Sequence, residues 1–203
     1  MFNVFDLIFP KYCLECKKRG RYLCVDCLGE PSGLRRKNGV IIIFPYKGIV
    51  RKAIWSLKYR YAYEIAKELA KLSVKELSKN LNLLPKKAIL VSIPLHMKKE
   101  KQRGFNQTIK IGRILAAGFN WDFLPDLLVR KVPTRIQANL SREERLANVK
   151  GAFGFNRKYI SLRRSRNLIL FDDVYTTGST MNEAKKVLTQ AGFKNIFCLS
   201  VAG

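Results

Sequence analysis

Residues 167–184 read NLILFDDVYTTGSTMNEA, and the interpretation of the whole chain starts from this stretch. Its apolar run has the composition of a buried strand and ends in two adjacent acids, Asp172 and Asp173. A turn of small hydroxyl residues around Gly178 follows, and a helical pattern continues from it to residue 192. An acid pair at the carboxyl end of a parallel strand lies where open α/β sheets bind their ligands.

The acids and the turn together indicate the kind of ligand. The carboxylates accept hydrogen bonds, whereas the turn offers Gly178 for close approach, the N–H groups of a helix N-terminus, and several hydroxyls. These hydroxyls belong to Thr176, Thr177, Ser179 and Thr180. We therefore expect a ligand with hydroxyls beside a phosphate, as in ribose 5-phosphate. The alternative is a strand end whose acids only cap the next helix.

The rest of the chain alternates between strand and helix patterns. Residues 39–46, 88–94, 127–132 and 195–202 read as strands, and residues 49–79, 103–118 and 140–153 as mainly helical. This alternation predicts an α/β fold with a mostly parallel sheet flanked by helices. We expect two parts, a small cysteine-bearing head with its linker at 1–38 and the main domain at 39–203.

Four of the five cysteines follow the pattern C-x2-C-x7-C-x2-C, at Cys13, Cys16, Cys24 and Cys27. Two such pairs can close a tetrahedral four-sulfur site, which predicts a structural zinc ion. Two disulfides or a redox pair are the alternatives. Residues 1–10 lack the features of a signal peptide, which argues against disulfides, and a redox pair needs no duplication. Cys198, in a predicted strand, is expected in the core.

The composition is strongly basic, with 39 Lys and Arg against 15 Asp and Glu and a formal net charge of +24. Residues 167–203, which contain the acid pair, hold equal numbers of basic and acidic side chains. Such an excess indicates a polyanionic partner such as nucleic acid, anionic lipid or a phosphorylated substrate, unless the charge only solvates the surface. No apolar run has the length of a membrane-spanning helix.

Aromatic and basic side chains interleave in residues 46–63, YKGIVRKAIWSLKYRYAY. Positive grooves that follow a nucleic-acid backbone often carry aromatic side chains on which bases stack. The stretch is therefore a candidate surface for single-stranded DNA, and an alternative is a basic helix whose aromatics pack on the core. The candidate residues are Lys52, Trp55, Lys58, Tyr59 and Arg60.

The stretch FDDVYTTGSTMNEA resembles the signature of type I phosphoribosyltransferases, which bind 5-phosphoribosyl-1-pyrophosphate (PRPP). The resemblance implies that Asp172 and Asp173 contact the ribose hydroxyls, and that Mg2+ is held mainly by pyrophosphate and ribose oxygens. It also implies a 5′-phosphate site formed by Tyr175, Thr176, Thr177, Gly178, Ser179 and Thr180.

Three further stretches resemble the competence protein F (ComF) family: IPLHMKKEKQRGFNQ (93–107), TRIQANLSREERLANVKGAF (134–153) and IWSLKYR (54–60). Met97 stands where that family usually has proline, and the head lacks a further cysteine pair found in many relatives. The resemblance implies a pyrophosphate loop with His96, Lys98, Lys99 and Arg103. It implies a flexible loop over the site with Thr134, Arg135, Gln137 and Arg145.

The family resemblance implies a role in natural competence, in the uptake or processing of single-stranded DNA. It implies work beside a membrane channel and a helicase-like ATPase, with a location in the cytoplasm that extends to the inner face of the membrane. Two other functions stay open at this point. One is an active phosphoribosyltransferase in nucleotide metabolism or salvage, and the other is a zinc-headed adaptor with a vestigial PRPP site.

Overall fold

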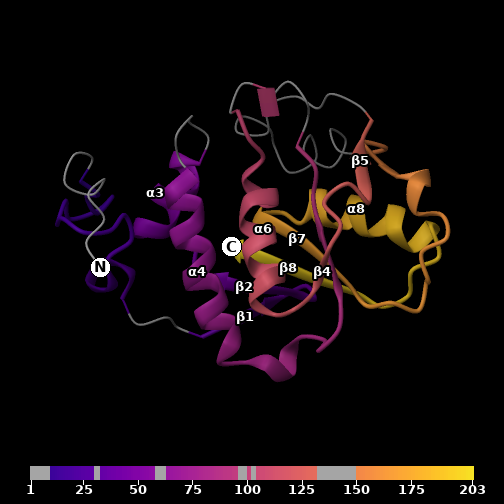
Figure 1. The fold of residues 1–203 in the computed structure, drawn as a ribbon, viewed down its shortest axis with the longest axis horizontal. Coiled ribbons are helices and arrows are strands. Elements are labelled where there is room, and N and C mark those ends of the chain that lie inside the picture. The colour runs from indigo at the N-terminus through magenta and orange to yellow at the C-terminus, as the bar shows by residue number, and fades with distance from the viewer. Residues whose placement is uncertain (1–9, 30–32, 58–62, 96–99, 102–103, 132–149) are drawn as a thin grey trace.

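A six-stranded sheet forms the centre of the molecule (Figure 1). The computed structural model describes residues 10–29, 33–57, 63–95, 100–101, 104–131 and 150–203. The strand order is β1-β2-β8-β7-β3-β4, where β1 is antiparallel to β2 and all other neighbours are parallel. The bounds are β1 Arg35–Lys37, β2 Val40–Phe44, β3 Ile89–Ser92, β4 Asp122–Phe123, β7 Leu168–Val174 and β8 Ile196–Ala202. The predicted α/β class with a mostly parallel sheet is confirmed.

The central strands are buried on both faces because their side chains alternate between two apolar layers. In β7, Ile169 and Phe171 face one layer, while Leu168 and Leu170 face the other. This explains why β7 reads as a continuous apolar run rather than as an alternating pattern.

Helices cover both faces of the sheet. The first layer holds α3 Gly48–Ser56, α4 Tyr63–Ser78 and α6 Gln107–Gly118, and the second holds α8 Ser179–Gln190. Shorter helical elements are α2 Val25–Leu28, η1 Leu81–Leu83 and η3 Arg157–Tyr159. In α8, Met181, Ala184 and Leu188 form the buried stripe, at the spacing of an amphipathic helix.

Two strands differ from the sequence-based expectation. The predicted strand 127–132 is observed as β5 Leu128–Arg130, but it pairs antiparallel with β6 Phe153–Phe155 outside the main sheet. Residues 35–37, expected in a linker, form β1 and pair with β2. The pairing of β5 with β6 is a long-range contact, which a local residue pattern does not specify. The pairing of β1 with β2 is a hairpin closed by Asn38 and Gly39, and this Asn-Gly turn was a local signal that the linker assignment missed. The predicted helix 140–153 falls mostly outside the described residues.

The candidate site lies between the neighbouring parallel strands β3 and β7, where the connecting helices leave toward opposite faces of the sheet. The helix that follows β3, α6, packs on one face of the sheet, whereas α8, which follows β7, packs on the other. A crevice between the carboxyl ends of two such strands is the usual ligand position in open α/β sheets. Within the described residues, no helix is long and apolar enough to cross a membrane.

Candidate functional site

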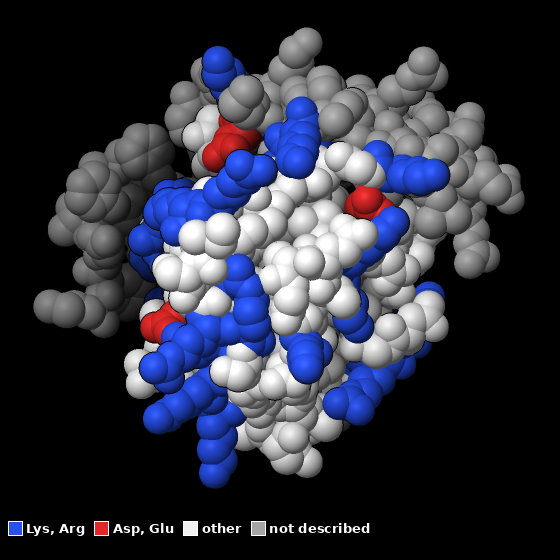
Figure 2. Space-filling model, turned by 90° about the vertical axis from the view of Figure 1, so that its right-hand side faces the viewer, with Lys and Arg blue, Asp and Glu red and all other residues white. Residues whose placement is uncertain are grey.

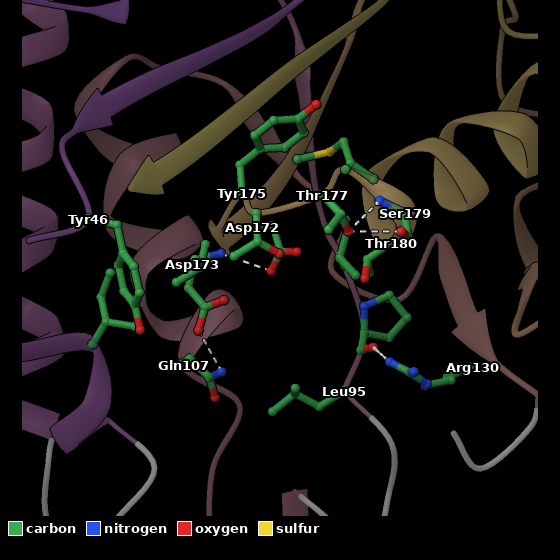
Figure 3. Close-up of a pocket in the computed structure, with 17 residues that line it drawn as sticks. Tyr46, Leu95, Gln107, Arg130, Asp172, Asp173, Tyr175, Thr177, Ser179 and Thr180 are labelled. Atoms are coloured by element: carbon green, nitrogen blue, oxygen red, sulfur yellow. Dashed lines mark hydrogen bonds between the residues drawn. The ribbon is translucent and has the colours of Figure 1, made fainter. Parts of the chain in front are cut away.

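A cavity of about 250 Å³ lies at the carboxyl ends of β3 and β7 (Figure 3). Its walls come from the segment after β3, the β7–α8 turn, the start of α6, β5 and the β2–α3 connection. The polar lining side chains are Tyr46, Gln107, Arg130, Asp172, Asp173, Thr176, Thr177, Ser179 and Thr180. The residues predicted for the ribose and the 5′-phosphate therefore line a single cavity.

Asp172 and Asp173 both line this cavity, and each is half-buried. The backbone N–H of Asp173 donates to Asp172 Oδ1 at 2.9 Å, which fixes the first carboxylate. Burial raises the pKa of Asp172 well above its usual range, and the neighbouring Asp173 carboxylate raises it further, while Arg130 opposes the shift. The raised pKa indicates that the negative charge of the pair is incompletely compensated, and a cation bound together with a ligand could compensate it.

Gln107 holds the second carboxylate in place. Its Nε2 donates to Asp173 Oδ2 at 2.8 Å, and its side chain is 3% exposed. The Oε1 atom of Gln107 is buried and has no hydrogen-bond partner among the described residues. A buried acceptor of this kind is costly unless a donor reaches it, and a hydroxyl of a bound ligand can do so.

The start of α6 positions Gln107 through two neighbouring side chains. Asn106 caps the helix, since its Oδ1 accepts from the backbone N–H of Thr108 at 3.0 Å. The Thr108 hydroxyl donates to the carbonyl of Ile93 at 3.1 Å, directly after β3. All three residues of this Asn-Gln-Thr step are at most 4% exposed. These hydrogen bonds connect the N-terminus of α6 to the end of β3, and they hold Gln107 where its side chain reaches Asp173.

The β7–α8 turn brings the predicted phosphate residues to the opposite end of the cavity. Thr177 Oγ1 and Ser179 Oγ are 2.8 Å apart, and the turn leads into the N-terminus of α8. Gly178 has φ +80°, and a Cβ there would lie 2.7 Å from the Tyr175 hydroxyl. This position therefore requires glycine on both conformational and steric grounds.

Tyr175 contributes differently from the other turn residues. Its backbone N–H donates to the carbonyl of Ala202 at 2.7 Å, and its ring is 4% exposed and turned into the core (Figure 3). Its hydroxyl accepts from Asn38 Nδ2 at 3.3 Å. The Tyr175 side chain supports the turn from behind, so the predicted 5′-phosphate groups that remain at the cavity are those of residues 176–180.

Three lining residues with polar side chains were missing from the predicted site: Gln107, Arg130 and Tyr46. Arg130 Nη1 donates to the carbonyl of Pro94 at 3.3 Å, and its guanidinium lies 5.2 Å from the Phe153 ring. Gln107 belonged to a stretch already noted for its family resemblance, which was a usable signal. Arg130 and Tyr46 reach the cavity only through tertiary packing, and their local sequence gave no such signal.

The four N-terminal cysteines form a second candidate site. Their Sγ atoms all lie within 4.8 Å of one another, and Cys24 Sγ is 3.5 Å from Cys13 Sγ and 3.7 Å from Cys16 Sγ. Four sulfurs at about 2.3 Å from a tetrahedral zinc ion would be about 3.8 Å apart. All four are free thiols, so the donor set and spacing fit a tetrathiolate metal such as zinc.

The ionisation of these thiols also fits a cation. Burial opposes thiolate formation at Cys13, but backbone hydrogen bonds outweigh it and lower the pKa of this thiol to about 6. Hydrogen bonds with Cys24 and Cys16, followed by burial, raise the pKa of Cys27 to about 12. Four adjacent thiolates cannot all form without a compensating charge, which a divalent metal provides.

The cysteine head packs directly on the main domain. Leu23 is 1% exposed and lies in the same apolar layer as α3 and α4. The backbone N–H of Tyr22 donates to Glu68 Oε2 of α4 at 2.8 Å, and Lys52 of α3 pairs with Glu15 at 3.0 Å. The cysteine head is therefore packed against α3 and α4 and shares their apolar layer.

The structure describes only part of the other predicted sites. Lys52 and Trp55 lie on α3 with exposed side chains, although Lys52 is engaged by Glu15. The remaining predicted residues fall outside the described residues: Lys58, Tyr59 and Arg60 of the DNA candidate, His96, Lys98, Lys99 and Arg103 of the pyrophosphate loop, and Thr134, Arg135, Gln137 and Arg145 of the flexible loop.

These features define an α/β protein with a polar pocket at the carboxyl edge of a mainly parallel sheet and a four-cysteine cluster that can hold a metal. The chain belongs to the competence protein F family. It is 30% identical to competence protein F of Haemophilus influenzae over 197 residues, which covers 93% of this chain and 82% of the relative.

Two further relatives agree with this assignment. Competence protein ComFC of Streptococcus pneumoniae is 30% identical over 98% of this chain and 84% of its own length. The DNA utilization protein YhgH of Salmonella typhi is 30% identical over 87% of this chain and 76% of its own length. No family model matches the chain.

Proposed function

We propose that the protein binds a phosphoribosyl ligand of the PRPP type in the cavity after β3 and β7, and acts in the handling of DNA during natural competence. The observation that carries this proposal is the meeting of the acid pair with the Thr176–Thr180 turn around one cavity of about 250 Å³. Carboxylates at one end accept from a diol, and a helix N-terminus at the other suits a phosphate.

Magnesium would enter with the ligand. Asp172 and Asp173 offer the hard carboxylate oxygens that Mg2+ prefers, and Mg2+ commonly combines one or two carboxylates with substrate phosphates. The raised pKa of Asp172 supports this role, because a nearby cation lowers the cost of the charged pair. Arg130 supplies a further positive charge from the side of β5.

The biological part of the proposal rests on the relatives. Those cited above are named for competence and for DNA utilization. The net charge of +24 suits a protein that meets nucleic acid. We extend the proposal to single-stranded DNA as the polyanion and to a helicase-like ATPase of the uptake machinery as a partner.

Binding of PRPP with Mg2+ is expected to raise the melting temperature, because a ligand present at 100 times its Kd stabilises the folded state by about 2.7 kcal/mol. For a chain of this length that corresponds to a shift of roughly 5–11 °C. Differential scanning fluorimetry with PRPP, ribose 5-phosphate or pyrophosphate, each with and without Mg2+, checks this. No shift with either phosphoribosyl compound would contradict the proposal.

The same material can decide between binding and catalysis. Pyrophosphate release from PRPP, followed across a panel of nucleobases and with single-stranded DNA as an alternative acceptor, tests for a transferase. Pyrophosphate release that depends on one particular nucleobase or on DNA would show that the protein is a phosphoribosyltransferase as well as a binding protein. A thermal shift without release would leave a binding protein.

Gln107→Leu is expected to weaken phosphoribosyl binding about tenfold, because it removes both the donor to Asp173 and the buried Oε1 acceptor, which has no partner among the described residues. Isothermal titration calorimetry with PRPP and Mg2+ measures the change. Gln190→Leu, an equivalent change at the exposed end of α8, serves as the control and should bind like the wild type. Equal affinities of the two variants for PRPP would contradict the assignment of Gln107 to the binding site.

A further inference from the structure

A second cavity, of about 500 Å³, lies between the cysteine head and α4, away from the pocket at the sheet edge. The head side is formed by Lys11, Gly20, Arg21, Leu23 and Val25. The α4 side is formed by Glu64, Lys67, Glu68, Lys71, Leu72 and Lys75. We refer to this cavity, with these lining residues, as the head–α4 groove.

The acidic residues of the groove are already engaged by the protein. Glu64 pairs with Lys11 at 3.2 Å and with Lys67 at 3.8 Å. Glu68 accepts from the backbone N–H of Tyr22 at 2.8 Å, which fastens the head to the helix. The carboxylates therefore act in holding the two walls together and are not available to neutralise the remaining cations.

Three groove cations lack such engagement. Arg21, Lys71 and Lys75 are exposed, and none of them makes an ion pair or a hydrogen bond with another residue in the part of the chain that the structure describes. Their side chains contribute positive charge on both sides of one groove. Such an arrangement is suited to an anion that enters between the walls.

The spacing along α4 indicates an extended anion rather than a compact one. Lys67, Lys71 and Lys75 recur every four residues along one stripe of the helix, so successive lysines advance by about 6 Å. Consecutive phosphates of an extended nucleic-acid strand are separated by a similar distance. A small anion would engage one or two of these lysines, and a flat bilayer would not follow a groove between two walls.

We propose that the head–α4 groove binds the sugar–phosphate backbone of a single-stranded nucleic acid. This deepens the proposed role in DNA handling and assigns it to a surface separate from the phosphoribosyl pocket. Apart from the two engaged carboxylates, the lining side chains are cationic or aliphatic and none is aromatic, so contacts to phosphates and sugars should dominate and the binding should depend little on sequence. The groove also has the four-cysteine head as one wall, so it exists only while the head is folded.

Charge alone does not identify this groove, because basic residues are also abundant on other faces. Figure 2 shows many Lys and Arg side chains on the side of the molecule that carries α8. Lys185 and Lys186 are exposed residues of α8, which packs on the opposite face of the sheet from α4. They provide a matched control, since their reversal changes the net charge by the same amount.

The double variant Lys71→Glu/Lys75→Glu is expected to weaken binding of a fluorescent single-stranded oligonucleotide by at least about tenfold. It should also reduce the slope of log K against log salt by about 1.4, because each phosphate contact contributes roughly 0.7 for a single strand. Lys185→Glu/Lys186→Glu should stay close to the wild type in both measurements. Fluorescence anisotropy at several salt concentrations, with a duplex of equal length as competitor, provides the data.

Three results would overturn this assignment: equal weakening by both double variants, an unchanged salt slope in the α4 variant, or preferential binding of the duplex. Arg21→Glu tests the head side independently, with metal content measured to show that the head is intact, and it should also weaken binding. Thermal stabilisation by PRPP and Mg2+ should be unchanged in the α4 variant. A failed groove with an intact ligand response would thus leave the phosphoribosyl proposal standing.

Discussion

Asp172→Asn is expected to abolish detectable binding of the phosphoribosyl ligand and at the same time to raise the melting temperature of the ligand-free protein. Both effects have one cause. The carboxylate of wild-type Asp172 is desolvated by the surrounding protein and lies beside a second carboxylate, and both effects raise its pKa well above the usual range. In the complex, the ligand and its cation compensate the negative charge of Asp172. In the ligand-free protein this charge is not compensated, so it lowers the stability of the folded state.

The dependence on pH follows from the direction of the shift. A carboxyl whose pKa is raised by folding favours the folded state in its protonated form, and this contribution is lost as pH rises through the folded-state pKa. The asparagine variant has no such loss. Its advantage should therefore be greatest at neutral and alkaline pH, at about 1 kcal/mol or roughly 2–4 °C, and should shrink as the pH is lowered.

Thermal denaturation between acid and neutral pH, with and without PRPP and Mg2+, measures both parts of this prediction. Asp122→Asn is the matched control, since Asp122 is an exposed carboxylate on β4 at the sheet edge, where it pairs with Arg166. It should retain the ligand response. An Asp172→Asn protein that is less stable than the wild type and still binds the ligand would contradict the assignment of the acid pair.

Local sequence signals were sufficient to predict the strand, turn and helix that line the candidate pocket. The apolar run of β7, the two acids, the glycine in the turn and the stripe of α8 all lie within residues 167–190, so one stretch specifies strand, turn and helix. The cysteine pairs were equally local, and the structure brings all four sulfurs together. Each of these features is encoded by neighbours in sequence, where propensity and spacing act directly.

The parts that could not be predicted depend on contacts between distant residues. Arg130 enters the cavity because β5 pairs with β6, some 25 residues further along the chain, instead of joining the main sheet. The pairing of β1 with β2 is different, because it is local. The two strands are joined by Asn38 and Gly39, both with positive φ, and this Asn-Gly turn is a hairpin signal that the sequence contained. Lys52, predicted as a DNA contact, pairs with Glu15 only because the head packs on α3.

Replacing Cys24 with serine is expected to cost the protein its bound metal and much of its stability. The thiol of Cys24 lies nearest the centre of the cluster, within 3.7 Å of both Cys13 and Cys16 sulfurs, and it also accepts from the backbone N–H of Cys27. A serine hydroxyl is a poor substitute for a thiolate toward zinc. The remaining three thiols would then hold the metal weakly.

The expected loss is large because a metal that binds only to the folded head would stabilise that fold. A metal at 1,000 times its Kd contributes about 4.1 kcal/mol, and for a chain of this size such a loss lowers the melting temperature by roughly 8–16 °C. The effect should spread beyond the head, since Leu23 packs in the same layer as α3 and α4. The head–α4 groove would lose one of its walls.

Native mass spectrometry and thermal denaturation measure the two consequences. Cys198→Ala is the control, because this buried cysteine lies on β8, far along the chain from the cluster, and its removal should leave the bound metal in place. Wild-type protein should show one metal ion per chain and four thiols that react with a thiol reagent only after chelation. A mass lower by two hydrogen atoms for each of two disulfides, with no metal, would instead support the disulfide alternative and contradict the metal assignment.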